Sequence, residues 1–488
     1  MLLRRNKKFH LRVLVAVYIS LCLAISAPLL PVSATTLEQH KEAAEARKLL
    51  PIESNQIENW PPGPAIGAAA AILIEANTGV ILYAKNIHEP QFPASTTKIM
   101  TCLLAIENSN LNDIVTFSST AVNSISWDSS KIGIKAGQSL TMEQALYASM
   151  VHSANDVTNG IAEFVAGDLA SFAEMMTRRA EELGAQNTNF MNSHGLFDEE
   201  HYSTAYDLAK IAIAYFRNEM LAKIGNTVRY NIMPSDNQPE EIFMRNRHRL
   251  INGEIPVDYK IIGGKTGFVN RSRQTLVTAA EKDGMRLVCV ILRQESPDQF
   301  YDTALLFDYG FSNFQIVNVA ANEKRYTIEN ASFFQTGNDI FGDSSPLLAL
   351  NPDDYLVMPK STDFRSLVAD ITYRTNIPSA IAEIIYTYNG AYLGTATIDF
   401  ASDNRSTYEF DQNMPVAAPE PAVIEEDNVV FINVRQAFYF IVVIAALVII
   451  SVIIRAAIKN YHFNRRRKRY RKKPVRKSRR DRFKGYYL

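Results

Sequence analysis

Two residues that could form a nucleophile and its base stand one helical turn apart, Ser95 and Lys98 in the segment Ser-Thr-Thr-Lys. They open an apolar pattern over Ile99, Leu103 and Leu104, so the spacing predicts that both lie at a helix N-terminus. A serine is a weak nucleophile unless a base takes its proton, and a lysine is that base only where burial or a second cation lowers its pKa. Alone, the pattern is weak, because Ser-x-x-Lys recurs by chance.

A second hydroxyl and an amide occur together at Ser153 and Asn155. A capping box at Thr141 and Gln144 predicts one helix before them, and a second helix is expected over 156–165. A break between two helices can present both polar groups to a cleft. By itself, the segment would be interpreted as a helix N-cap.

A third candidate group is Lys265, Thr266 and Gly267, which end a run that begins at Tyr259 and precede a predicted hairpin. That position is expected of an edge strand beside a cleft. A lysine and a threonine hydroxyl there can bind a substrate carboxylate, and a glycine lets backbone approach closely. This tripeptide is also a poor signal alone.

The elements that must position these groups are predicted to form an α/β (α+β) fold, an antiparallel sheet flanked by helices. Asp283-Gly284 marks one hairpin turn, residues 95–216 are mainly helical in pattern, and 296–308 is expected to be a closing amphipathic helix. Strands in two hairpins are expected at 68–75, 80–86, 274–281 and 285–292. Hairpins that bracket a helical block imply a sheet covered by helices.

After Tyr309-Gly310 the pattern changes to short β-type runs, which predict a small all-β domain over 311–412. Its strands are expected at 355–358, 366–374, 382–388 and 391–398. A leader at 35–64 precedes the predicted catalytic domain at 65–310. Residues 413–436, with their prolines and acids, are expected to be a stiff linker.

Charge is segregated although the chain's formal net charge is zero. The last 34 residues carry 16 basic residues and one acid, and the first 34 carry five basic residues and no acid. The chain has 51 basic and 51 acidic residues, so residues 35–454 contain 30 basic and 50 acidic residues. The net charge of this middle part is therefore −20. An acidic body excludes nucleic acid as the main partner, because a phosphate backbone needs a basic footprint.

Both ends predict contact with a membrane. Residues 1–34 have the layout of a secretory signal peptide with cleavage after Ala34, although an uncleaved signal anchor is an alternative. The uncharged run 437–454 predicts a transmembrane helix, and the basic tail 455–488 would stay in the cytoplasm and contact anionic membrane lipid. The body between them is therefore expected outside the cytoplasmic membrane, in a single-pass protein.

Two cysteines lie beyond the signal segment, Cys102 in a helical pattern and Cys289 in a strand pattern. Both are expected to be buried free thiols, although an exported protein can carry a disulfide. His194 is expected to be a structural loop residue, and His152 is assigned no role.

Together, the three motifs in this order resemble the signature of the penicillin-recognising serine enzymes. Five further segments narrow the resemblance to the low-molecular-weight penicillin-binding proteins of the S11 D-alanyl-D-alanine carboxypeptidase family. These segments are 68–86, 93–101, 194–196, 202–209 and 283–287. The similarity covers residues 65–310 almost continuously, and the β domain and C-terminal anchor more weakly.

The resemblance implies a penicillin-binding/β-lactamase-like catalytic domain that cuts peptidoglycan stem peptides ending in D-Ala-D-Ala and is inhibited by β-lactams, without metal or cofactor. By this resemblance, Ser95 would be the acyl-ester nucleophile and Lys98 its general base. Ser153 would relay a proton, and Asn155 would orient the reacting groups. Lys265 and Thr266 would bind the substrate carboxylate beside Gly267, and the N–H groups of Ser95 and Phe268 would form the oxyanion hole.

One departure from the family pattern follows Gly267, where an Ala-Gly pair is usual and this chain has Asn-Arg-Ser-Arg at 270–273. Two arginines beside the cleft would change substrate preference or rate. The alternatives are a β-lactamase or endopeptidase on the same scaffold, and an inactive peptidoglycan-binding relative. The absence of a recognisable Glu-based deacylation loop weighs against a β-lactamase.

Overall fold

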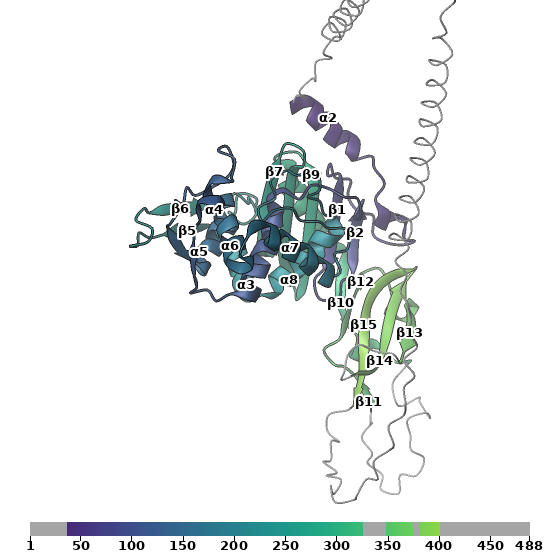
Figure 1. Cartoon of the computed structure of the whole chain (residues 1–488). Helices are drawn as coiled ribbons and strands as arrows, with labels where there is room; N and C mark the ends of the chain where they lie inside the picture. The colour runs from purple at the N-terminus through teal and green to yellow at the C-terminus, as the bar shows by residue number, and fades with distance from the viewer. Residues whose placement is uncertain (1–36, 326–347, 374–379, 401–488) are drawn as a thin grey trace, which may run out of the picture. The chain divides into compact units, whose positions relative to one another are not determined.

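A five-stranded antiparallel sheet organises the larger part of the chain, in the order β2-β1-β9-β8-β7. Its strands are β1 (Ala70–Glu75), β2 (Ile81–Lys85), β7 (Lys260–Val269), β8 (Arg273–Lys282) and β9 (Met285–Gln294). β1 and β2 thus precede a mainly helical part of the chain, and β7, β8 and β9 follow it (Figure 1). β7 is left at the sheet edge, beside the helices.

The computed structural model describes residues 37–325, 348–373 and 380–400. The predicted signal peptide (1–34), linker (413–436), transmembrane helix (437–454) and basic tail (455–488) lie outside these residues. None of the helices within the three ranges has both the length and the apolar character that a membrane crossing requires.

Helices cover both faces of the sheet. Helix α8 packs on one face and α10 on the other. The helices of the described residues are α2 (Leu37–Arg47), α3 (Lys98–Asn108), α4 (Ser119–Asn123), α5 (Met142–Tyr147), α6 (Asn155–Ala166), α7 (Leu169–Glu182), α8 (Ala205–Arg217), α9 (Glu219–Gly225), α10 (Asp298–Asn313) and α11 (Val319–Asn322). Single turns occur at η1 (Glu53–Gln56), η2 (Ala94–Thr97), the π-helix η3 (Ala148–His152) and η5 (Phe364–Ser366). Two small two-stranded antiparallel sheets complete the helical side, β3 (Ile114–Thr116) with β4 (Ser139–Thr141), and β5 (Arg229–Ile232) with β6 (Ile242–Arg245).

The sheet separates two hydrophobic cores, because successive strand side chains point to opposite faces. Along β1, Ile72 and Ile74 pack with α3 and α8, whereas Leu73 packs with the side chains of α10. Cys102 lies in the first core and Cys289 in the second, and both are buried and free. The prediction of two buried free thiols is therefore confirmed.

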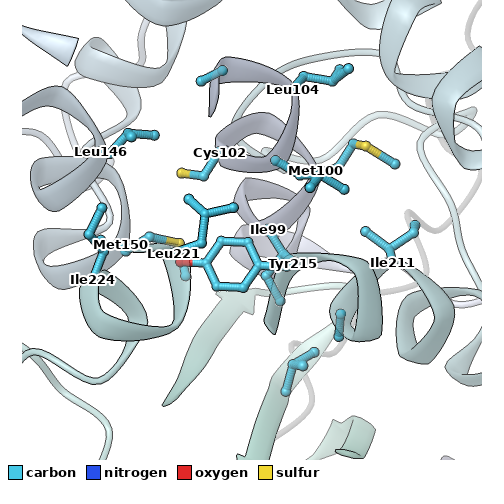
Figure 2. Close-up of a cluster of buried hydrophobic side chains, with 14 of the residues drawn as sticks. Ile99, Met100, Cys102, Leu104, Leu146, Met150, Ile211, Tyr215, Leu221 and Ile224 are labelled. Carbon is cyan, nitrogen blue, oxygen red and sulfur yellow. The ribbon is translucent and has the colours of Figure 1, made fainter. Parts of the chain in front are cut away.

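Helix α3 is held by its apolar side chains. Figure 2 shows these side chains surrounded by others from α5, η3, α8 and α9; the residues are Ile99, Met100, Cys102, Leu104, Leu146, Met150, Ile211, Tyr215, Leu221 and Ile224. In a core packed this closely, a change in side-chain volume of even one methylene group disturbs the neighbouring side chains. The packing of α3 thus fixes Lys98 at its first position and the η2 turn just before it, which carries Ser95.

The strands that follow α10 form two smaller antiparallel sheets. β10 (Phe314–Asn318) pairs with β12 (Tyr355–Pro359), and four strands follow the order β11-β15-β14-β13. The latter are β11 (Leu348–Leu350), β13 (Val368–Thr372), β14 (Ala380–Tyr388) and β15 (Ala391–Phe400). Each of the four runs that were expected to form strands in this region contains one.

The prediction of a mixed α/β fold with antiparallel sheets and flanking helices is confirmed, with two local corrections. The closing helix was expected to end at Asp308, but α10 continues to Asn313, because Gly310 lets it pack closely on Leu73 and Leu287. The leader at 35–64 was assigned no helix, yet it contains α2. The buried Lys85 amine holds that helix by donating to the Arg47 carbonyl oxygen at 2.7 Å.

Candidate active site

The turn before α3 presents Ser95 at the surface of the helical side. Ala94 adopts a left-handed conformation with φ of 50°, and the Pro93 carbonyl oxygen accepts hydrogen bonds from Thr96 Oγ1 at 2.7 Å and Thr275 Oγ1 at 2.8 Å. Since Thr275 belongs to β8, these bonds tie the turn to the sheet. Ser95 itself is partly exposed.

Lys98 lies one turn below Ser95 and is fully buried. Its Nζ is 3.1 Å from Ser95 Oγ, 2.6 Å from Asn155 Oδ1 and 2.8 Å from the His194 carbonyl oxygen. An ammonium would donate to all three oxygens. A neutral amine would donate to the amide and the carbonyl, which can only accept, and its lone pair would then face the serine hydroxyl.

Burial keeps the Lys98 pKa well below its ordinary value, and the positive charge of Lys265 lowers it further. Desolvation disfavours the charged form of a lysine, and a nearby cation acts in the same direction. The neutral amine is therefore accessible at a pH where an exposed lysine is protonated. Ser95 thus has a base in contact with its hydroxyl.

Ser153 lies in the break between η3 and α6, as the sequence predicts, whereas Asn155 is the first residue of α6, one position before the expected start of that helix. Ser153 adopts a left-handed conformation (φ 65°, ψ 36°), which costs about 1 kcal/mol for a residue with a Cβ. Asn155 is held by its N–H, which donates to the Ser130 carbonyl oxygen at 2.9 Å. Asn155 thus reaches Lys98, whereas the Ser153 hydroxyl, which is partly exposed, has no hydrogen-bond partner among the described residues.

Edge strand β7 brings Lys265, Thr266 and Gly267 beside the nucleophile turn. A Cβ at Gly267 would lie 2.9 Å from the Ser95 nitrogen and 2.3 Å from Thr275 Oγ1, so only glycine permits this approach. Phe268 follows, with 48% of its surface exposed, and pairs with Gln274. The Ser95 amide and the backbone of β7 therefore meet at one point.

Lys265 is the second buried lysine of the site. Its Nζ donates to the Thr266 carbonyl oxygen at 2.9 Å. Burial lowers its pKa to about 7, and the positive charge of Arg247 contributes. An incoming carboxylate would supply the counter-charge that this ammonium lacks.

Gly195 and the neighbouring carbonyl of His194 are parts of the site that motif reasoning left without a role. Gly195 has φ of 81°, and a Cβ there would lie 1.8 Å from the Ala94 carbonyl oxygen. The backbone of this loop can therefore approach the nucleophile turn only at a glycine. His194 contributes its carbonyl to Lys98, and its own ring nitrogen Nδ1 accepts from the Leu196 N–H at 3.2 Å.

His201 supports the same turn from behind. Its Nδ1 accepts from the Met191 N–H at 3.0 Å, so the ring proton is on Nε2, which lies 2.8 Å from Thr97 Oγ1. Burial lowers the pKa of His201 to about 4, which keeps the ring neutral near pH 7. Its position could not be inferred from the chain, since Thr97 is 104 residues away.

A cavity of about 460 Å³ lies next to the Ser153 segment, and His152 lines it together with Arg247. Arg245 and Arg249 also line the cavity, and both face Glu254, at 3.5 and 3.7 Å. Arg247 lowers the pKa of both His152 and Lys265, although burial is the main cause in each case. It is a cation at the site that the motifs did not indicate.

The two arginines that depart from the family pattern have different surroundings. Arg273 donates to both carboxylate oxygens of Glu295, with its Nη2 at 2.7 Å from Oε2, and the glutamate side chain is only 3% exposed. Arg273 therefore fastens the end of the β7–β8 hairpin to the segment after β9. Arg271 is exposed, with its guanidinium carbon 5.8 Å from the ring centre of Phe197.

Replacing Arg273 by alanine is expected to lower the free energy of unfolding by about 3 kcal/mol, because it leaves the buried Glu295 carboxylate without its partner. Urea titration followed by circular dichroism measures the change. The matched control is Arg365→Ala, which removes the exposed pair with Asp363 and is expected to change nothing measurable. Equal effects of the two substitutions would contradict the structural role of Arg273.

The site therefore brings together Ser95, Lys98 and Asn155 by direct contact, and places Lys265, Thr266 and Gly267 on the adjoining strand. A hydroxyl with a buried amine as its base suits nucleophilic attack and a covalent intermediate. Within the described ranges, no group of three or more His, Cys, Asp or Glu side chains is arranged to hold a metal ion.

Comparison with known proteins relates this site to one family. The family model for D-alanyl-D-alanine carboxypeptidase, peptidase S11, matches residues 56–296. The D-alanyl-D-alanine carboxypeptidase DacF of Bacillus subtilis is 34% identical over 251 residues, 51% of this chain and 63% of its own length. The D-alanyl-D-alanine carboxypeptidase DacB2 of Mycobacterium tuberculosis is 32% identical, over 52% of this chain and 84% of its own length.

Among solved structures, penicillin binding protein 5 of Haemophilus influenzae aligns with 70% of this chain and 98% of its own, with a TM-score of 0.55. Its sequence identity is 24%, so this likeness concerns the fold. The alignment is longer than that of the two sequence relatives.

Proposed function

The chain belongs to the peptidase S11 family of D-alanyl-D-alanine carboxypeptidases, and we propose that it removes the terminal D-alanine from peptidoglycan stem peptides through an acyl-enzyme. The observation that carries this proposal is the buried Lys98 amine, 3.1 Å from Ser95 Oγ and held by Asn155 and the His194 carbonyl. A base in that position is what a serine nucleophile requires.

In the proposed reaction, Lys98 takes the Ser95 proton while Oγ attacks the carbonyl carbon of the penultimate D-alanine. The N–H groups of Ser95 and Phe268 stabilise the oxyanion. When the C–N bond breaks, the proton passes through Ser153 to the leaving amine, and D-alanine departs. Water then attacks the ester, restores the Ser95 hydroxyl and releases the shortened peptide.

The terminal carboxylate of the substrate is proposed to bind at Lys265 and Thr266. Two features support this placement, the buried ammonium of Lys265 without a carboxylate partner among the described residues, and the nearby charge of Arg247. A charged hydrogen bond in such a site is worth about 2 kcal/mol. β-Lactams, which carry a carboxylate beside a strained amide, would bind in the same orientation and acylate Ser95.

The titration of Lys265 predicts a pH dependence. Carboxylate binding needs the ammonium, whose pKa is about 7 in the free protein, so kcat/KM for a peptide is expected to fall as the pH rises through that value. A bound carboxylate favours the ammonium, so the fall in kcat should come at higher pH. In Lys265→Arg, whose guanidinium does not titrate, the alkaline fall should disappear. Persistence of the same fall in that variant would assign it to another group.

Two measurements on the full chain in detergent test the proposed function. Intact-mass analysis after exposure to penicillin should show one adduct per chain, and an acylated Lys-D-Ala-D-Ala peptide should release free D-alanine. Rapid turnover of penicillin without peptide cleavage would indicate a β-lactamase, and cleavage restricted to cross-linked peptides an endopeptidase. Wall binding with neither reaction would indicate an inactive relative.

The place of the enzyme is proposed from its sequence. The signal-like residues 1–34, the apolar run 437–454 and the basic tail 455–488 support a single-pass membrane protein with the catalytic part outside the cytoplasm and the tail against anionic lipid. Protease added to intact cells should then digest the catalytic part and leave a short C-terminal fragment in the membrane. Full protection would contradict this topology.

A further inference from the structure

A partly exposed aromatic rim is formed by Phe92, Phe197 and Arg271, of which Phe92 lies next to the nucleophile turn in the chain. The rings of Phe92 and Phe197 meet edge to face, with their centres 5.0 Å apart, and the Arg271 guanidinium carbon is 5.8 Å from the centre of the Phe197 ring. Phe197 exposes 44% of its surface, and Arg271 is also exposed. Phe92 is partly buried. A solvent-exposed phenylalanine in contact with an arginine, as Phe197 is, can pack against a ligand.

The rim is built from the same segments that form the site. Phe92 precedes Ser95 by three residues, and Phe197 follows Gly195, whose backbone lies against the nucleophile turn. Arg271 follows the end of β7 at Val269 by two residues. Any group held at the rim is therefore close to the peptide that Ser95 attacks.

The order of groups along β7 decides which part of a substrate meets the rim. In the proposed reaction, the terminal carboxylate is at Lys265 and Thr266, and the scissile carbonyl is at Phe268. A strand and an extended peptide both advance about 3.3 Å per residue, so the residue before D-Ala-D-Ala lies farther along, toward Arg271. The cavity lined by Arg247 lies at the opposite end, near Lys265 and the proposed site of the terminal carboxylate.

The charge of Arg271 is available to a ligand. Within the part of the chain that the structure describes, no carboxylate forms an ion pair with it, in contrast to Arg273. Asp198 is on the same loop as Phe197, but its Oδ1 accepts from the Glu200 N–H at 2.9 Å. Contact with an aromatic face orients a guanidinium and leaves its edge free to donate to a carboxylate.

We propose that the aromatic rim binds the side chain of the residue that precedes D-Ala-D-Ala, and that Arg271 binds a carboxylate at the end of that side chain. The hydrocarbon part of the side chain packs on Phe92 and Phe197. Such a subsite favours a diaminopimelyl residue, which carries that carboxylate, over a lysyl residue, which lacks it. This inference rests on the proposed carboxypeptidase function.

A matched pair of peptides tests the inference. The full chain in detergent is assayed with Nα,Nε-diacetyl-diaminopimelyl-D-Ala-D-Ala and with Nα,Nε-diacetyl-lysyl-D-Ala-D-Ala, which differ only in the carboxylate. We expect kcat/KM to be about three- to tenfold higher for the first peptide, as for a partly exposed charged hydrogen bond. In Arg271→Gln the ratio should fall to about one, whereas Arg178→Gln, which removes an exposed arginine on α7, should preserve it.

Penicillin titration counts the active sites of each variant, so a folding defect is not mistaken for a change in preference. An equal ratio in wild type and Arg271→Gln would overturn the inference. A longer peptide carries a D-glutamyl residue before the diaminopimelyl residue. If amidation of the α-carboxylate of that D-glutamyl residue abolished the effect of Arg271→Gln, the inference would also be overturned. Failure of the wild-type protein to release D-alanine from either peptide would instead overturn the proposed function.

Discussion

Ser95→Ala protein is expected to gain no mass on exposure to penicillin and to release no D-alanine from peptides. The hydroxyl that would form the ester is gone. No other group can replace it, because Ser95 Oγ is the hydroxyl that Lys98 Nζ contacts. The fold should persist. Lys98 keeps its bonds to Asn155 and to the His194 carbonyl, and Ser95 is not part of either hydrophobic core.

Ser153→Ala is the matched control for this experiment, since it removes the second hydroxyl of the proposed site. It is expected to slow acylation while still giving the adduct. If Ser95→Ala retained the adduct and Ser153→Ala lost it, the nucleophile would be Ser153, and the proposed mechanism would be wrong. Peptide mapping of the wild-type adduct distinguishes the two directly.

Lys98→Met is expected to lower the second-order rate of acylation by penicillin about 10³-fold, the usual contribution of a positioned general base. Methionine has a similar length and suits a buried site, but it cannot take the serine proton. Stopped-flow measurement with a fluorescent penicillin gives the rate. The control is Lys41→Met on α2, where the lysine is exposed and no effect is expected.

The pH profile gives Lys98→Met a second readout. Burial and the charge of Lys265 lower the pKa of Lys98, so the neutral base becomes populated as the pH rises through that lowered value. Acylation of the wild type should therefore accelerate with pH up to that point, and Lys98→Met should lack this rise. A rate within tenfold of wild type, or an unchanged acidic limb, would exclude Lys98 as the base.

Both predictions depend on a lysine that is costly to bury. Removing a lysine from water disfavours its charged form, and the three oxygens around Nζ offset part of that cost. Two of them also occupy the protons of the neutral amine and so direct its lone pair. The same contacts therefore stabilise the buried group and prepare it for proton transfer.

The local chemistry of the sequence indicated much of the fold. Asp283-Gly284 turns the chain between β8 and β9, and Thr141 with Gln144 forms the capping box that begins α5. These features depend on residues a few positions apart, so their patterns are readable in the chain. The end of α10 was misjudged for the opposite reason, since Gly310 serves a close contact with the sheet rather than a helix end.

By itself, the sequence determined which groups could react, because Ser95 and Lys98 share one helical turn and their spacing alone brings them together. Only the tertiary structure decided what surrounds them. Asn155 and the His194 carbonyl meet Lys98 across 57 and 96 residues of chain, and the burial that lowers its pKa comes from packing between distant helices. It also decided that Arg273 pairs with the buried Glu295 while its neighbour Arg271 faces solvent, because the direction of each side chain depends on long-range contacts.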